Sequence, residues 1–148
     1  MIRPATHDDI DRLVILGEEM HVESRFARLP LDVDKVRALF AHLIESPDGL
    51  LIVAEKDGEV IGGFAGYVAE HYFARTKVAS DFGLFISKQE RGGMNAVRLL
   101  KAYARWAKEH GAVMIQAGIT TGVHVEATSL MYKKIGFRQV GVLFELED

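Results

Sequence analysis

The sequence contains no cysteine among its 148 residues and only three prolines. Without cysteine, the chain can form no disulfide, no thiolate metal site and no cysteine nucleophile. The absence also suits a reducing compartment. A large excess of one charge is missing as well, because the formal net charge is only −3. Composition therefore gives no general attraction to nucleic acids or anionic membranes, and we expect neither as a partner.

Long apolar segments are missing too. No run approaches the length of a membrane-spanning helix, and residues 1–6 hold no apolar signal core. What is present is ordinary for a soluble protein, with 49% hydrophobic and 26% charged residues. The length suits one domain with its own core. We predict a single cytoplasmic domain over residues 1–148.

Hydrophobic spacing in the first half predicts two helices among several strands. Thr6 is the expected N-cap of the first helix, and the second helix starts at Asp32 or Asp34. The expected strands are residues 2–5, 50–55 and 60–68, and residues 26–30 form a loop. Asp57-Gly58 between the last two strands predicts a β-hairpin. Three glycines in residues 60–68 suggest a bulge or the close approach of another group.

The second half alternates strands with helices. The expected order is a strand at 78–87, a helix at 93–110 closed by Gly111, a buried strand at 113–120, a helix at 126–135 and a closing strand at 137–146. A helical crossover makes the pair 78–87 and 113–120 parallel, whereas the hairpins make the other pairs antiparallel. The predicted class is α/β with a mixed (α+β) sheet, mostly antiparallel and twisted, flanked by about four helices.

Residues 86–100 carry the clearest sign of a ligand site. A strand ending at Ile86 runs into Arg91-Gly92-Gly93, and a long amphipathic helix follows. Glycines let the backbone approach a ligand, and the first N–H groups of a helix have no partner within it, so this turn predicts an anion site. For Arg98 on that helix, attraction of the ligand's phosphates and a place on the solvated face are equally supported. Arg105 and Lys108 fit the solvated face.

The element order and two local motifs resemble the GNAT superfamily of N-acetyltransferases. Residues 91–96 are similar to its R/Q-x-x-G-x-G/A coenzyme loop, with Arg91 and Ala96 matching and Met94 standing at the central glycine. Residues 132–137 are similar to its late Y-x-K-L/I-G-F segment, with Tyr132 as the tyrosine. Val125 stands where that family often has an asparagine.

The resemblance implies acetyl-CoA as a co-substrate, a primary amine on a small molecule or a protein as the acceptor, and direct transfer in a ternary complex without a metal. It places the pantetheine arm on a strand edge and the phosphates at the glycine turn. The expected coenzyme-binding residues are Leu84, Phe85, Ile86, Arg91, Gly92, Gly93, Met94, Asn95, Ala96 and Arg98. Tyr132 would lie near the coenzyme sulfur and act as the general acid.

The general base is less specified by the sequence. Asp81 lies at the start of the strand that leads to the glycine turn, where a carboxylate can face the acceptor, so we expect it to be the base. The alternatives are Glu70, His71, His124 and Glu126. Residues 21–30 and 70–77 are expected to shape the acceptor site. His124 near Glu126 could also suggest a metal site, but two residues without a third ligand make a poor one.

Two other functional classes remain open. The fold could persist as a module that binds acyl-CoA or a protein partner without turnover. Nucleic-acid binding has little support, since Arg91-Gly92-Gly93 is no repeat and no aromatic residues are interleaved with the basic ones. Relatives usually place two strands after the tyrosine helix, whereas residues 137–148 have room for one long strand or for two very short ones broken at Gly141. We expect the single strand. The edge left beside it predicts a homodimer.

Overall fold

The computed structural model of the chain describes residues 1–147. Its sheet has five strands in the order β1–β2–β3–β4–β5. These strands are β1 (Ile2–Pro4), β2 (Gly49–Lys56), β3 (Glu59–Glu70), β4 (Lys77–Ile86) and β5 (Met114–Ile115). All neighbouring pairs are antiparallel except β4 and β5, which are parallel. The predicted mixed sheet with one parallel pair is therefore confirmed.

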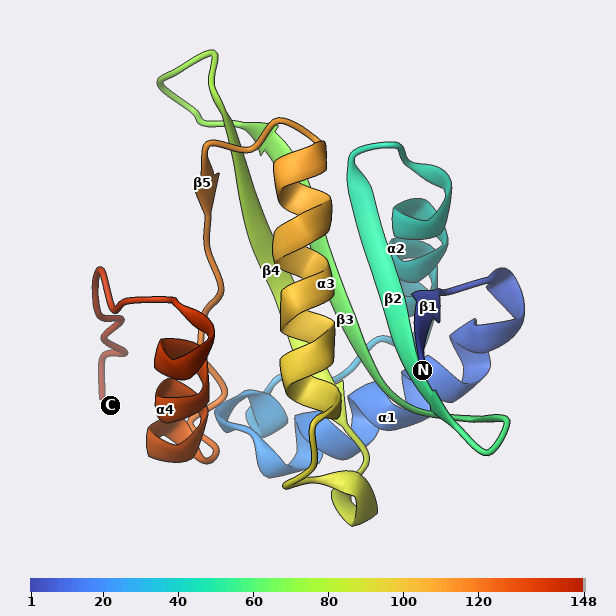
Figure 1. Cartoon of the computed structure of the whole chain (residues 1–148). Helices are drawn as coiled ribbons and strands as arrows, with labels where there is room; N and C mark the ends of the chain where they lie inside the picture. Colours follow the sequence, from blue (N-terminus) through green and yellow to red (C-terminus); the bar gives the residue numbers. More distant parts are fainter. Residues whose placement is uncertain (148) are drawn as a thin grey trace.

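Helices cover both faces of this sheet (Figure 1). Helices α1 (Ile10–Glu23) and α2 (Val33–Glu45) bury their apolar side chains against one face. Helix α3 (Asn95–Glu109) packs on the other face, together with α4 (Val125–Ile135), which lies beside the segment that follows β5. Short 3₁₀ helices precede α1, follow it and precede α3; they are η1 (His7–Asp9), η2 (Arg25–Arg28) and η3 (Lys88–Glu90). The sheet thus separates two apolar cores.

Local signals explain most element boundaries. The β2–β3 hairpin turns through Asp57 and Gly58, whose φ angles of 52° and 78° fit the turn that Asp-Gly favours. The side chain of Asp32 accepts a hydrogen bond from the N–H of Lys35 at 3.1 Å and caps α2. The glycine-rich strand confirms the predicted close approach, since a Cβ on Gly66 would lie 2.9 Å from the carbonyl oxygen of Ser80.

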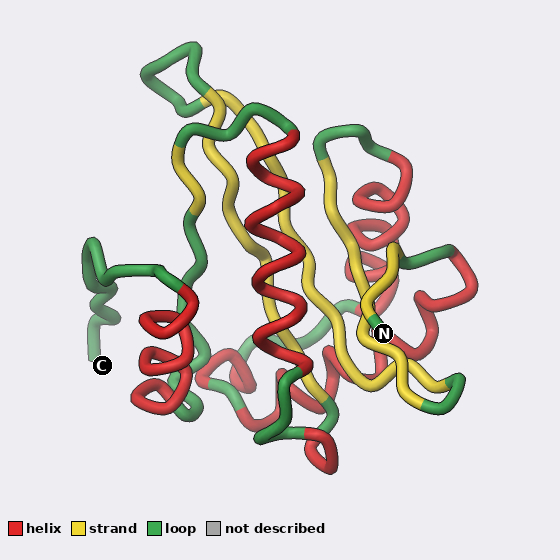
Figure 2. The backbone as a smooth tube through the Cα atoms, in the orientation of Figure 1, coloured by secondary structure: helices red, strands yellow, loops and turns green. Residues whose placement is uncertain are grey.

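The parallel pair separates soon after it forms, as the strands in Figure 2 show. Ala79 pairs with Ile115, and the N–H of Gln116 still reaches the carbonyl oxygen of Ala79 at 2.9 Å. Two residues later, the N–H of Gly118 bonds to the side chain of Asp81. β4 also bulges here, because Asp81 lies opposite Gly66 and Gly83 opposite Ala65, which leaves Phe82 without a counterpart on β3.

Several sequence expectations were wrong. The strand expected at 113–120 is only Met114–Ile115. Beyond it the chain leaves β4, because the N–H of Gly118 bonds to the side chain of Asp81 instead of to a backbone carbonyl of β4. The loop at 26–30 is partly the 3₁₀ helix η2. Residues 137–147 hold no strand. Their alternating apolar residues stay exposed, with Val140 at 73% and Phe144 at 87%, while Glu145 pairs with arginines of η2.

Candidate active site

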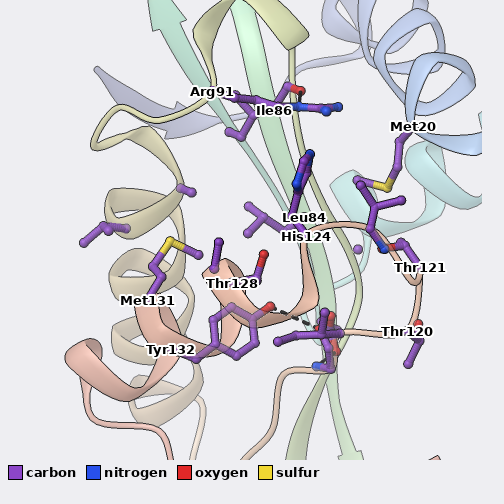
Figure 3. Close-up of a pocket in the computed structure, with 18 of the residues that line it drawn as sticks. Met20, Leu84, Ile86, Arg91, Thr120, Thr121, His124, Thr128, Met131 and Tyr132 are labelled. Atoms are coloured by element: carbon purple, nitrogen blue, oxygen red, sulfur yellow. Dashed lines mark hydrogen bonds between the residues drawn. The ribbon is translucent and has the colours of Figure 1, made fainter. Parts of the chain in front are cut away.

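A cavity of about 1080 Å³ opens where β4 and the segment after β5 separate (Figure 3). Its walls come from α1, η2, β4, the loop before α3, residues 118–124, and helices α3 and α4. In Figure 3, Arg91 and Ile86 lie at one end and Tyr132 lies toward the other. The cavity therefore joins the glycine turn to the late helix that the sequence singled out.

The glycine turn leaves the N-terminus of α3 open. Within the described residues, no side chain caps this helix and no acidic residue lies in its first turn. Gly92 has a φ of 88°, which a residue with a side chain rarely adopts. The nearest atom to a Cβ built on Gly93 is 3.8 Å away, so the backbone there is freely approachable. Unpaired N–H groups at such an end favour an anion.

Met94 occupies this loop without strain. Its φ of −89° is one that any residue adopts. Met94 is 56% exposed and lines the cavity. The position at which the sequence departs from the family motif therefore needs no glycine for its backbone conformation.

Arg91 connects the turn to α1. Its Nε donates to the carbonyl oxygen of Ile86 at 3.2 Å, and its two terminal nitrogens bond to the carboxylate of Glu23. The Arg91 guanidinium holds the pKa of the Glu23 carboxyl below its ordinary value. Glu19, one turn earlier, accepts the N–H of Lys88 at 2.7 Å. Two carboxylates of α1 therefore fix the loop in place.

Tyr132 is buried at the other end of the cavity. Its hydroxyl donates to the carbonyl oxygen of Gly118 at 3.1 Å, drawn as a dashed line in Figure 3. Burial raises the pKa of this phenol, and the negative charge of Asp81 adds to the effect. The hydroxyl therefore stays protonated at neutral pH and can donate a proton or a hydrogen bond.

Asp81 also contacts Gly118, on the side opposite to Tyr132. Its Oδ1 accepts the N–H of Gly118 at 3.0 Å. Burial raises the pKa of the Asp81 carboxyl, and this bond opposes the shift in part. A carboxylate with a raised pKa binds a proton more readily near neutral pH than an exposed one. The residue therefore has the position and the chemistry of a base.

The other predicted residues divide between the cavity and its surroundings. Those that line it, besides Asp81 and Tyr132, are Leu84, Ile86, Arg91, Gly92, Gly93, Met94 and Ala96. Phe85 faces the opposite core, where its ring stacks on Phe40 with centroids 6.2 Å apart. Asn95 and Arg98 lie outside the wall. Phe85 can thus contribute only its backbone.

The residues considered as alternative bases lie in different parts of the structure. His124 lines the cavity, and its ring lies beside Leu84 in Figure 3. Its φ of 48° is in the left-handed region, where a residue with a side chain is strained. Glu70 and His71 line a second, smaller cavity of about 270 Å³, and Glu126 lines neither. Within residues 1–147, no three potential metal ligands gather to hold an ion.

Residues 21–30 contribute to the wall as expected, whereas no residue of 70–77 lines the cavity. Sequence reasoning missed the loop after β5 and its contacts with η2. Arg25 of η2 joins these parts, since its backbone N–H bonds to the carbonyl oxygen of Thr121 at 2.8 Å and its Nε to that of Thr120 at 2.5 Å. Met20 and Phe26 extend this wall. The contacts span 95 residues of sequence, and no local motif marks them.

Comparisons with known proteins agree with this architecture. The family model "Acetyltransferase (GNAT) family" matches residues 17–137. No curated protein matches the chain. In residues 1–147, every helix is too short or too polar to span a bilayer.

Several solved structures share the fold. A transcriptional regulator from Bacillus halodurans C-125 is 24% identical, with a TM-score of 0.76 over 100% of this chain and 99% of that one. Aminoglycoside 6'-N-acetyltransferase AAC(6')-IG from Acinetobacter haemolyticus is 14% identical, with a TM-score of 0.76 over 100% of this chain and 97% of that one. Aminoglycoside N-acetyltransferase AAC(6')-Iy in complex with CoA is 15% identical, with a TM-score of 0.80 over 100% of this chain and 93% of that one.

Proposed function

The chain belongs to the acetyltransferase (GNAT) family, and we propose that it transfers an acetyl group from acetyl-CoA directly to a primary amine in a ternary complex. One observation carries the proposal. A single cavity connects an open helix N-terminus, a separated strand edge and the buried hydroxyl of Tyr132. Those features correspond to the phosphates, the pantetheine arm and the thioester of the coenzyme.

The cavity offers matching groups for the diphosphate and for the pantetheine arm of acetyl-CoA. N–H groups of the turn and of the first turn of α3 supply donors for the diphosphate, and the open space at Gly93 lets the phosphates approach. β4 is separated from the segment after β5 beyond Asp81, so its edge from Leu84 to Ile86 can pair with the pantetheine amides. Arg91 and Lys101, which also line the cavity, add positive charge at the phosphate end.

The proposed chemistry needs one acid and one base. The amine nitrogen attacks the thioester carbonyl carbon, the carbon–sulfur bond breaks, and an amide and a CoA thiol result. Asp81 accepts the proton that the amine loses, and Tyr132 donates a proton to the leaving sulfur. To do so, the Tyr132 hydroxyl turns its hydrogen away from the Gly118 carbonyl, which requires only rotation about the phenol C–O bond. No metal and no enzyme nucleophile is required.

A second candidate is a module that binds the coenzyme without turnover. Met94 and Val125 depart from the family motifs, and a neighbour at 24% identity is described as a transcriptional regulator. The two candidates differ in one measurement. The enzyme releases CoA thiol when an amine is present, whereas the module binds acetyl-CoA and releases none with any amine.

The exposed tail supports a homodimer. Val140, Val142, Leu143, Phe144 and Leu146 are each at least 68% exposed, and β5 is the last strand of its sheet. An apolar surface of several hundred Å² commonly marks a protein contact, and an unpaired edge invites one. Light scattering at micromolar concentration should give twice the 16.5 kDa mass of the chain. A monomer at that concentration would count against the dimer.

The cytoplasmic location stays a prediction.

Calorimetric titration with acetyl-CoA tests the proposal first, with CoA and ATP as comparison ligands. We expect micromolar binding of both CoA species and no comparable binding of ATP, because the pantetheine arm should pair with the β4 edge. Release of free thiol in the presence of an amine then separates the enzyme from the binding module. Absence of binding by either CoA species would overturn the proposal.

A further inference from the structure

The acceptor side of the cavity holds very few free negative charges. Among the described residues that line the cavity, only Glu23 and Asp81 carry carboxylates. Glu23 is already engaged, since both terminal nitrogens of Arg91 bond to it. Only Asp81 remains, and in the proposed reaction it receives the proton of the reacting amine.

Positive charge is better represented than negative charge in the cavity lining as a whole. Arg91 is paired with Glu23, so the remaining charged side chains of the lining are Lys101 and Lys134 against the single carboxylate of Asp81. An acceptor with a second ammonium group would lose water around that group and find no carboxylate to replace it. Leaving a desolvated charge unpaired costs several kcal/mol, a penalty that acts against such an acceptor.

The wall across from Tyr132 is apolar instead. Figure 3 shows Met20, Thr120 and Thr121 on this side, opposite Tyr132 and Met131. The large apolar side chains that α1, η2, β4 and the loop after β5 contribute to the cavity are Met20, Phe26, Phe82, Leu84, Ile86, Ile119 and Val123. The ring of Phe82, at the β4 bulge, lies on that of Tyr67 with centroids 5.0 Å apart, which limits its movement.

From this charge balance and this wall, we infer that the acceptor is a monoamine with an aromatic or aliphatic body rather than a polyamine or another polycation. The inference rests on the proposed function and names the substrate class of that same site. A flat apolar group can pack against Phe26 and Phe82, and its single amino group can reach Asp81. The hydroxyls of Thr120 and Thr121 can hydrogen-bond to polar groups beside it but carry no charge to balance an ammonium group.

A monoamine with an aromatic body and a polyamine together test the inference. The rate of CoA thiol release should be measured with 2-phenylethylamine and with spermidine at saturating acetyl-CoA. We expect kcat/KM for 2-phenylethylamine to be at least about tenfold higher. A preference for spermidine would overturn the inference and leave the proposed transfer intact. If acetyl-CoA itself fails to bind, both proposals fall.

A designed charge gives an independent test. The Oγ1 of Thr121 accepts the N–H of Val123 at 3.2 Å, a contact that an aspartate or asparagine oxygen can also make. Thr121→Asp should therefore keep the loop and add a carboxylate to the wall, and Thr121→Asn keeps the shape without the charge. We expect the ratio of kcat/KM for spermidine over 2-phenylethylamine to rise about tenfold in Thr121→Asp only.

The readout of this pair is a ratio within each variant, so a change in folded fraction cancels. A control in the β3–β4 turn, Phe73→Ala, removes an aromatic ring that is 75% exposed and outside the cavity, and it should not alter the ratio. If Thr121→Asn shifts the ratio as much as Thr121→Asp, or neither variant shifts it, charge at this wall does not select the acceptor and the inference is wrong.

Discussion

Tyr132 and Asp81 bond to opposite sides of one residue, Gly118. The phenol donates to its carbonyl oxygen at 3.1 Å, and the carboxylate accepts its N–H at 3.0 Å. The peptide at the point where the chain leaves β4 is thus held by two side chains instead of a strand. The same two side chains line the cavity, so the residues that hold the peptide where the strands separate are also the proposed acid and base.

Tyr132→Phe should lower kcat about 10²-fold if the hydroxyl is the general acid. Coenzyme affinity should stay within about twofold, because the turn before α3 is untouched. Loss of the bond to Gly118 should reduce the free energy of unfolding by about 1 kcal/mol. Thiol-release kinetics, calorimetry and thermal unfolding measure the three effects, and an unchanged kcat would remove Tyr132 from the mechanism.

Tyr103→Phe is the matched control for this variant. Tyr103 is also buried, and its hydroxyl donates to a carbonyl oxygen of the same segment, that of Gln116, at 2.5 Å. It does not line the cavity. We expect a similar loss of stability with kcat nearly unchanged. Equal losses of kcat in the two variants would mean that the segment's stability, not the acid, sets the rate.

Gly93→Val should weaken acetyl-CoA binding at least about tenfold without unfolding the protein. A Cβ at this position meets no atom closer than 3.8 Å, so the free protein has room for it. The valine would instead occupy the space that the phosphates need. Gly141→Val in the tail, where a Cβ has nothing within 4 Å, is the control. Undiminished affinity in Gly93→Val would place the phosphates elsewhere.

The sequence predicted those parts of the fold that depend on local signals. Asp57-Gly58 gave the hairpin, and the apolar spacing with Gly111 gave the extent of α3 to within two residues. The motif around Gly93 and the tyrosine at 132 are both found at one cavity. Each of these features is encoded within a window of a few residues, which is why spacing and turn chemistry suffice.

Features that depend on distant contacts could not be predicted. The alternating residues 140–146 read as a strand, yet a strand needs a partner edge, and in the structure Glu145 pairs with Arg25 and Arg28 instead. The contacts that join α1 and η2 to the rest of the cavity wall could not be predicted for the same reason. Glu23 contacts Arg91 across 68 residues, and neither residue's local sequence indicates that contact.

Asp9→Asn should destabilise the protein at neutral pH. Arg3 donates to both oxygens of Asp9, at 2.8 and 3.1 Å, and thereby ties β1 to the start of α1. This pairing lowers the pKa of Asp9 below its ordinary value of 3.8, so its stabilisation is present above pH 3.8 and is lost as pH falls through the native pKa.

We expect Asp9→Asn to lower the free energy of unfolding at pH 7 by about 1–2 kcal/mol, measured by urea denaturation. The difference from the unmodified protein should shrink as the pH falls below 3.8. Asp8→Asn, at the exposed neighbouring carboxylate, is the control and should change stability little. A difference that persists unchanged at low pH would show that shape, and not charge, accounts for the effect.

Asp81→Asn separates a base from a positioning residue. An amide oxygen can still accept the N–H of Gly118 but cannot take a proton, so kcat should fall about 10²-fold or more with the fold intact. Burial raises the pKa of Asp81 above 3.8, so its ionised form costs stability that increases as pH rises through the native pKa. Asp81→Asn should therefore unfold at a higher temperature than the unmodified protein at pH 7. This advantage should shrink as pH falls through the native pKa and be absent below pH 3.8. Asp81→Ala, which also loses the Gly118 contact, should gain less or be destabilised. Full activity in Asp81→Asn combined with lost activity in Asp81→Ala would mean that Asp81 only sets the separation of the strands.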